Sequence, residues 1–271
     1  MVVINNLKKK THKMKIKTLG LMALAIALST SCKEDEPTVP PPTENTNVQI
    51  NLHYDYNFGA DDFTLNNEYI TDSGYTVKFS LATFYLSKPS IVDMGGNTTE
   101  LNPEYLIIRP SDNVSDLGFM QEGHAHMFNI SVGIDSATNT ENGSTGVQPS
   151  DFTDPNNPLG PQPESMYWTW ASGYIFVKIE GEVDYEGDGT YDQIFKYHLG
   201  LNEFRKDRST MIHTDVLGGE SLDLEMTIDY KEFFQGVDLK TELVTMSMGE
   251  GRTLGLKMMN QFDQALSISK R

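Results

Sequence analysis

The sequence predicts an all-β protein: an antiparallel β-sandwich with one long loop and a short C-terminal helix. Two observations support this fold class. Short runs of alternating apolar and polar residues recur along the chain, and segments rich in Gly, Asn, Asp and Pro separate them. No long stretch of helical periodicity lies between these runs, which favours a sandwich over an α/β protein.

The predicted strands follow one another from residue 48 onward. The alternation is clearest in Val48–Tyr54 and Tyr75–Leu81, where every second residue is apolar, as expected when one face of a strand is buried. Six further runs complete the set: Phe84–Leu86, Tyr105–Arg109, His126–Gly133, Tyr174–Val183, Gln193–Leu199 and Ser221–Ile228. Near the C-terminus, apolar residues recur every four positions and predict an amphipathic helix over one end of the sandwich. These residues are Leu254, Met258, Phe262 and Leu266.

Residues 1–31 have the character of a bacterial lipoprotein signal peptide. Six lysines precede the apolar stretch Leu19–Leu28, which is too short to span a bilayer. Small residues then lead to Cys32, the single cysteine of the chain. We therefore expect cleavage before Cys32 and a lipid on its sulfur. The expected product is an exported outer-membrane lipoprotein that faces the periplasm or the cell surface.

Residues 32–47 are predicted to form a tether to a domain that spans residues 48–271. The tether is acidic and rich in proline, a composition that buries too little apolar surface to fold by itself. Removal of the signal peptide takes away six lysines and no acid, so the formal net charge changes from −17 to −23. A surface this acidic argues against nucleic-acid binding.

The composition also limits the chemistry of the mature chain. With Cys32 acylated, no thiolate is left for a metal site or a disulfide, so a metal would need imidazole, thioether, carboxylate or carbonyl ligands. The sequence contains no Gly-rich phosphate loop and no Gly-x-Ser-x-Gly elbow. No nucleophile, base and orienting residue can be assembled from it. We therefore expect a binding protein and not an enzyme.

A long irregular stretch runs from Asp135 to Gln162 and is followed by an aromatic block, Met166–Trp170. Loops of this length inside compact domains are often functional. The block contains both tryptophans of the chain, Trp168 and Trp170, which are two residues apart and so lie on one side of a strand. They would either form part of the core or flank a binding site.

Five segments occur in a characteristic order. They are Leu52–Tyr54, Phe84–Ser87, GIDSATN (Gly133–Asn139), MYWTWASGYIFVKIEG (Met166–Gly181) and YHLG (Tyr197–Gly200). Together they resemble the MbnP-like copper-binding family over about residues 47–265. The resemblance implies an extracytoplasmic copper-binding β-protein whose founding members accompany methanobactin and a dihaem partner enzyme. In related copper proteins an oxidised tryptophan, kynurenine, joins two histidines at Cu(I).

The resemblance marks His53 and His198 as candidate copper ligands. Trp168 and Trp170 would flank the ion, and either could be the oxidised tryptophan. Met166 could supply a thioether sulfur, a soft ligand that Cu(I) accepts. Each residue also has a structural alternative, because histidines are often hydrogen-bonded within sheets and methionines and tryptophans often pack in cores.

Two other motifs bear on metals. His124 and His126 lie at i and i+2, so on a strand they would share one face and could chelate Cu(II) or Zn(II), or simply be solvated. His213 stands alone in the sequence. The segment Asp184–Asp192 matches several positions of a calcium loop, although its twelfth position is Phe195 where a glutamate belongs. The alternative for this segment is a plain acidic hairpin.

The predicted function is a membrane-anchored, extracytoplasmic protein that captures or presents copper, with a dihaem oxidase-type partner implied by the resemblance. The alternative is a surface lipoprotein without metal, whose aromatic loop binds a glycan or a protein.

Overall fold

The computed structural model describes residues 45–141, 145–191 and 193–271. The predicted signal peptide, Cys32 and nearly all of the predicted tether lie outside these ranges. Most of the described chain is strand, and its two α-helices are α1 (Tyr230–Phe233) and α2 (Arg252–Gln264). No helix in the described ranges has the length and apolar character needed to span a membrane.

The smaller sheet has the strand order β15-β13-β1-β2, and β7 also pairs with β1. The bounds are β1 (Asn47–Phe58), β2 (Asp61–Asp62), β7 (Val114–Gln121), β13 (Ser221–Asp229) and β15 (Leu266–Lys270). β1 and β13 run parallel, with Leu52 opposite Leu224. Parallel neighbours need a long connection, and most of the domain lies between these two strands.

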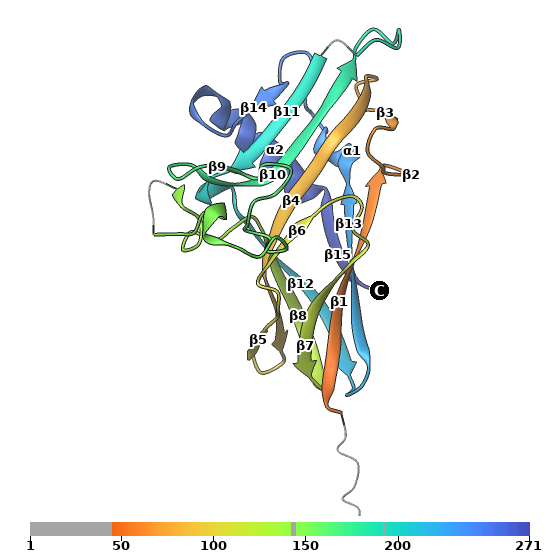
Figure 1. Ribbon diagram of the computed structural model, residues 1–271. Helices are drawn as coiled ribbons and strands as arrows, with labels where there is room; N and C mark the ends of the chain where they lie inside the picture. Colours follow the sequence, from red (N-terminus) through yellow and green to blue (C-terminus); the bar gives the residue numbers. More distant parts are fainter. Residues whose placement is uncertain (1–44, 142–144, 192) are drawn as a thin grey trace, which may run out of the picture. The chain divides into compact units, whose positions relative to one another are not determined.

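The larger sheet has the strand order β12-β8-β4-β10-β11-β14. The bounds are β4 (Thr76–Asp93), β8 (Gly123–Val132), β10 (Gly173–Asp184), β11 (Gln193–Gly200), β12 (Lys206–Val216) and β14 (Val244–Thr245). Four short strands pair at its margins: β3 (Glu68–Ile70), β5 (Thr98–Glu100), β6 (Tyr105–Ile108) and β9 (Tyr167–Thr169). The first half of β4 pairs with β10 and its second half with β8, so this strand connects the two ends of the sheet (Figure 1).

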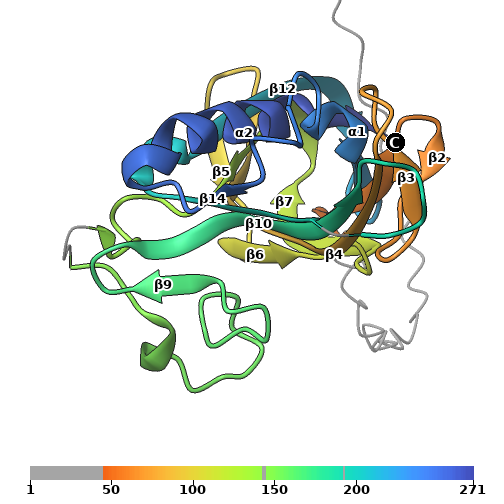
Figure 2. The same ribbon diagram turned by 90° about the horizontal axis from the view of Figure 1, so that it is seen from above.

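The two sheets pack as the predicted β-sandwich, and alternate residues of each strand fill the space between them. They are mixed and not purely antiparallel as predicted, because β1 runs parallel to β13 and β11 parallel to β14. Val48, Ile50 and Leu52 of β1 are fully buried, while the residues between them are half-exposed. The predicted amphipathic helix is confirmed as α2, which lies across one side of the larger sheet (Figure 2). Its Phe262 ring packs 5.0 Å from that of Phe84, between ring centroids.

All eight predicted strands are present, and Tyr75–Leu81 and Phe84–Leu86 prove to be parts of the single strand β4. The prediction missed the short strands β2, β3, β5 and β14, and it missed β15, which begins at Leu266 where the helix was expected to continue. It also missed two longer strands, β7 and β12, which bury few residues: in β12 only Ile212 and Val216 are buried. The positions of β12 in phase with these two include Lys206, Arg208, Thr210 and Thr214, so the strand is polar on both faces and lacks the alternation on which the prediction depended.

Candidate metal centre

Three histidines from two neighbouring strands converge on the outer face of the larger sheet. β8 and β12 pair antiparallel, with His124 opposite Asp215 and Ala125 opposite Thr214. A β-bulge in β12 between Met211 and Thr214 inserts an extra residue. Such a bulge redirects side chains, and here it brings His213 beside His126.

The ring nitrogens of this three-histidine cluster are close enough to share one metal ion. The Nδ1 atoms of His126 and His213 are 3.3 Å apart. One ligand atom from each of His124, His126 and His213 lies within 4.8 Å of the others, and no other such group of three or more His, Cys, Asp or Glu occurs in the described ranges. Two imidazole nitrogens bound tetrahedrally at 2.0–2.1 Å from a metal are about 3.3 Å apart, which matches the observed pair.

His124 is held in an orientation that suits a ligand. Its Nδ1 is 2.7 Å from Oδ1 of Asp215. If that nitrogen donates to the carboxylate, Nε2 carries a lone pair, and this Nε2 is buried and has no hydrogen-bond partner among the described residues. A carboxylate on one ring nitrogen and a metal on the other is a common arrangement at metal-binding histidines, because the carboxylate fixes the tautomer and increases the basicity of the ligand.

The backbone at His213 lies in the left-handed region, with φ of 37°. Few non-glycine residues adopt this conformation, and residues that do so typically carry a strain of about 1–3 kcal/mol. The strain falls on the residue that completes the cluster, and strained residues are concentrated at functional sites. His213 is one of six non-glycine residues with positive φ in the described chain, and its conformation belongs to the β-bulge that places it beside His126.

Sequence reasoning found the pair His124 and His126 but missed His213, which is 87 residues from His126 in the chain. The only signal that could have joined them was the antiparallel register of β8 and β12. That register was not accessible because β12 itself was not predicted.

A model of the protein family described as MbnP matches residues 45–248, most of the chain. The chain belongs to the MbnP family. Among solved structures, MbnP from Methylosinus trichosporium is similar in fold, with a TM-score of 0.56 and 13% sequence identity over 83% of this chain and 99% of that one. The comparison with curated proteins gives no significant match.

Several of the MbnP-like motif residues, Trp168 and His198 among them, lie at the other end of the larger sheet from the three-histidine cluster. His198 on β11 bonds through Nε2 to Oε1 of Glu180 at 2.6 Å. Trp168 packs on Gly200, where an added Cβ would lie 2.7 Å from Cζ3 of the indole. Since residues 198 and 200 point to the same side of the strand, Trp168 and His198 share one face.

The other histidine marked by the MbnP-like motifs, His53, lies on the smaller sheet. Its Nε2 is 2.9 Å from Oδ1 of Asp223. Hydrogen bonds from Ser221 and then from His53 lower the pKa of Asp223 to about 2. Because β1 turns its alternate residues inward, His53 faces outward on the opposite side of the sandwich from His198. The structure does not bring these two histidines together.

The two remaining motif residues differ in exposure. Met166 is buried in the core, and Trp170 is 45% exposed in the turn after β9. A nearby cavity of about 250 Å³ under the long loop is lined by residues that include Tyr85, Tyr167 and Tyr174, and neither tryptophan contributes to that lining.

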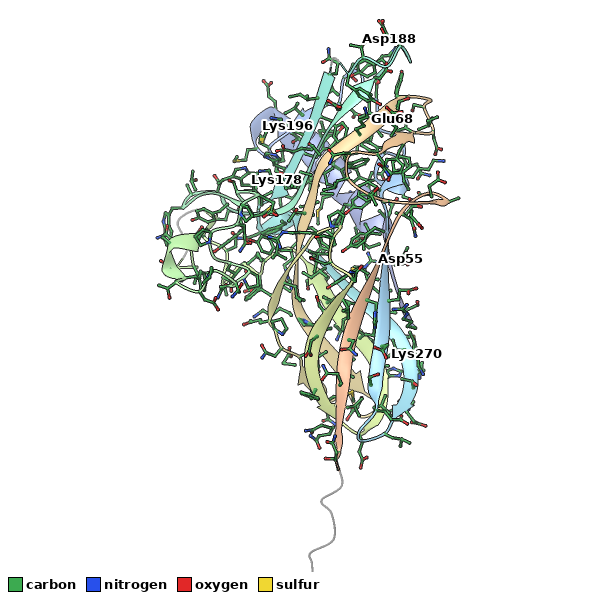
Figure 3. All side chains as sticks on the ribbon, turned by 45° about the vertical axis from the view of Figure 1, so that its right-hand side comes forward. Asp55, Glu68, Lys178, Asp188, Lys196 and Lys270 are labelled. Atoms are coloured by element: carbon green, nitrogen blue, oxygen red, sulfur yellow. The ribbon has the colours of Figure 1, made fainter. Side chains whose placement is uncertain are left out.

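The separation between the two regions follows from strand register. His198 is opposite Lys178, and Lys178 is opposite Thr83 of β4. At the other end, Asp93 of β4 is opposite Ala125, beside the cluster. From residue 83 to residue 93 the strand rises by roughly 30 Å. Figure 3 labels Lys178 at the upper level and Lys270, whose Nζ bonds to Thr214 next to His213, at the lower level.

The segment Asp184–Asp192 forms an acidic hairpin tip, near the labelled Asp188 in Figure 3. The Asp184 carboxylate accepts the backbone N–H groups of Glu186, Gly187 and Gly189 at 2.7–3.0 Å. These bonds close the turn with the oxygens that a calcium ion would need. The arrangement gives no support to a calcium site; Asp192 itself lies outside the described residues.

His198 is expected to make stability depend on pH. Burial lowers its pKa, despite the opposing hydrogen bond that its Nε2 donates to the Glu180 carboxylate. The unfolded chain therefore takes up this proton more readily, and stability should fall as pH drops below about 6.5 and through the lower pKa of the folded state. In metal-free protein, the free energy of unfolding, measured with urea, should fall less between pH 7 and pH 5 in His198→Gln than in wild type. His213→Gln, at an exposed position, is the control; an unchanged pH dependence in His198→Gln would contradict the expectation.

Asp215→Ala is expected to lower the affinity for Cu(II) about tenfold. This is the low end of the usual effect of removing a carboxylate that bonds a ligand histidine, because Asp215 is largely exposed. The variant removes the acceptor that orients His124. Titration against a competing chelator measures the change. Asp207→Ala, on the same strand and also exposed, should leave the affinity unaltered. Equal effects of the two substitutions would show that only surface charge matters.

Proposed function

We propose that this MbnP-family chain is a copper-binding protein and that His124, His126 and His213 hold the ion. The observation that carries the proposal is the convergence of three imidazoles with a 3.3 Å nitrogen pair. Imidazole is a good ligand for copper, and the MbnP-like resemblance implies copper as the metal. Neutral imidazoles give the ion no charge compensation, so the nearby carboxylate of Asp215 would supply part of it.

The position of the cluster suits capture and presentation of the ion. His213 is exposed and His124 is about one-third exposed. Three protein ligands leave a further coordination position open to solvent or to an exchanging ligand. We infer a binding protein that takes up and releases copper, and not an enzyme.

The cluster lies at the end of the domain where the described chain begins. The turns on either side of it contact the first described residues: Glu122 N–H donates to Thr46 O at 2.8 Å, and Gly219 N–H donates to Asn47 O at 2.9 Å. If residues 32–44 tether the domain to a lipid on Cys32, the tether would join the domain at this end. We propose an outer-membrane lipoprotein that binds copper.

Replacing Cys32 by alanine should abolish lipidation, because no other cysteine can accept the lipid. Fatty-acid labelling in cells and fractionation of the envelope measure this. The alanine variant is expected to lose the label and to leave the membrane fraction, or to keep its signal peptide uncleaved. Labelling that persists in the variant would contradict the lipoprotein assignment.

The oxidised tryptophan implied by the resemblance would belong to a different position. Trp168 shares a face with His198, roughly 30 Å along β4 from the three-histidine cluster. A dihaem oxidase-type partner would therefore act at that other end of the sheet. Kynurenine raises the residue mass by about 4 Da, since one carbon is lost and one oxygen gained. Peptide mapping of native protein distinguishes a kynurenine site there from the imidazole site proposed here.

The proposal is tested by the metal content of the purified chain after exposure to Cu(II) and removal of weakly bound ions. Elemental analysis should give one copper per wild-type chain and none in a variant with His124, His126 and His213 all replaced by alanine. The same triple substitution should leave the circular dichroism spectrum unchanged, because all three side chains lie on the outer face. Equal copper content in both proteins would overturn the proposal.

A further inference from the structure

Two methionines lie beside the three-histidine cluster on the same face of the sheet. Met127 of β8 and Met211 of β12 are direct cross-strand partners. The neighbouring residues Phe128 and Ile212 are buried in the core, so both methionines point outward. Met211 is 62% exposed, which is high for a large apolar side chain.

The methionine pair is next to the cluster along the strands. From the methionine pair toward the bulge, the next side chains that point outward are His126 of β8 and His213 of β12. Beyond these two lie His124 and Asp215. Met211 and His213 are two residues apart, at most about 7 Å along the strand. A methionine side chain has three rotatable bonds and can bring its sulfur across such a distance.

The surroundings do not favour a packing role for this pair. On its other sides lie Asn129 and Ser209, which are cross-strand partners and polar, and Val92 of β4, the cross-strand partner of Met127. A small apolar group on the outer face, with Met211 largely exposed, contributes little to the core, whereas thioether sulfur is a soft ligand that selects Cu(I). Zn(II) and Cu(II) are well served by imidazole alone.

We propose that Met127 and Met211 supply thioether ligands when copper in the three-histidine cluster is Cu(I). This inference rests on the proposed function. The imidazoles would hold Cu(I), Cu(II) or Zn(II), and the sulfurs would add to the binding of Cu(I) only. The pair would thereby favour copper over zinc in a site that has no thiolate.

The test uses the purified full-length chain with both methionines replaced by leucine, a substitution of similar volume. Cu(I) affinity is measured without oxygen by competition with bicinchoninate, and Zn(II) and Cu(II) affinities by competition with chromophoric chelators. Cu(I) affinity should fall about tenfold or more, and the other two should stay within about twofold. Met248→Leu, also exposed but outside the cluster, should change none of them.

Two results would overturn the inference while leaving the proposed function intact. One is an unchanged Cu(I) affinity in the double variant together with a loss in His126→Ala. The other is an equal loss for all three ions in the double variant, which would indicate a general disturbance of β8 and β12. If wild type and His126→Ala bind Cu(II) and Zn(II) equally well, the three-histidine site itself is wrong, and the inference falls with it.

Discussion

Replacing His213 by alanine is expected to lower the affinity for Cu(II) by more than about a hundredfold. Loss of a group that only hydrogen-bonds a ligand commonly reduces metal affinity about 10–100-fold, and His213 is placed to bind the ion directly. Its Nδ1 forms the 3.3 Å pair with His126, so the variant leaves at most two imidazoles in the cluster. The change should be measured by isothermal titration and by competition with a chelator of known affinity.

His53→Ala and His198→Ala are the matched controls for this prediction. Both are partly buried histidines whose Nε2 bonds a carboxylate, and both lie outside the cluster. Each should change the Cu(II) affinity by less than about twofold, within the range expected of remote substitutions. If His198→Ala abolished binding while His213→Ala did not, the copper site would lie beside Trp168, as the resemblance by itself implies.

Replacing Phe79 by alanine is expected to destabilise the domain by about 3–5 kcal/mol, the usual range for deleting a buried phenylalanine ring. Phe79 is fully buried on β4. Its ring centroid lies 4.9–6.5 Å from those of six other aromatic residues: Phe58, Phe63, Tyr69, Phe195, Tyr230 and Phe234. Removal of this ring therefore leaves a cavity between the two sheets.

Urea unfolding followed by circular dichroism measures this loss. Ile194→Ala, on strand β11 of the same sheet but 54% exposed, is the control and should lie within about 0.5 kcal/mol of wild type. Copper affinity of the folded Phe79→Ala protein should be close to that of wild type, because residue 79 belongs to the half of β4 far from the three histidines. A loss below about 1 kcal/mol would show that the core collapses around the missing ring.

The fold was predictable because its strands obey a local rule. In β1 each second residue is buried, and the same alternation revealed β4, β8 and β13. Strand pairing is not local. The parallel contact between β1 and β13 joins residues about 170 positions apart, and nothing in either segment specifies its partner.

The candidate site was predictable only in part for the same reason. His124 and His126 could be paired because they are two residues apart on one strand. His213 joins them through the register and bulge of β12, a strand that was not predicted because most of its inward positions are also polar. Conversely, the motif order that marked His53 and His198 contains no information on which sheet each occupies. The structure places them on opposite outer faces.

The location of the copper ion tests the central claim most directly. Crystals of copper-loaded protein, measured just above and just below the copper absorption edge, would show the ion as an anomalous difference peak. The three-histidine site predicts one peak about 2 Å from a ring nitrogen of each of His124, His126 and His213. A peak beside His198 and Trp168, with none between the three histidines, would contradict it.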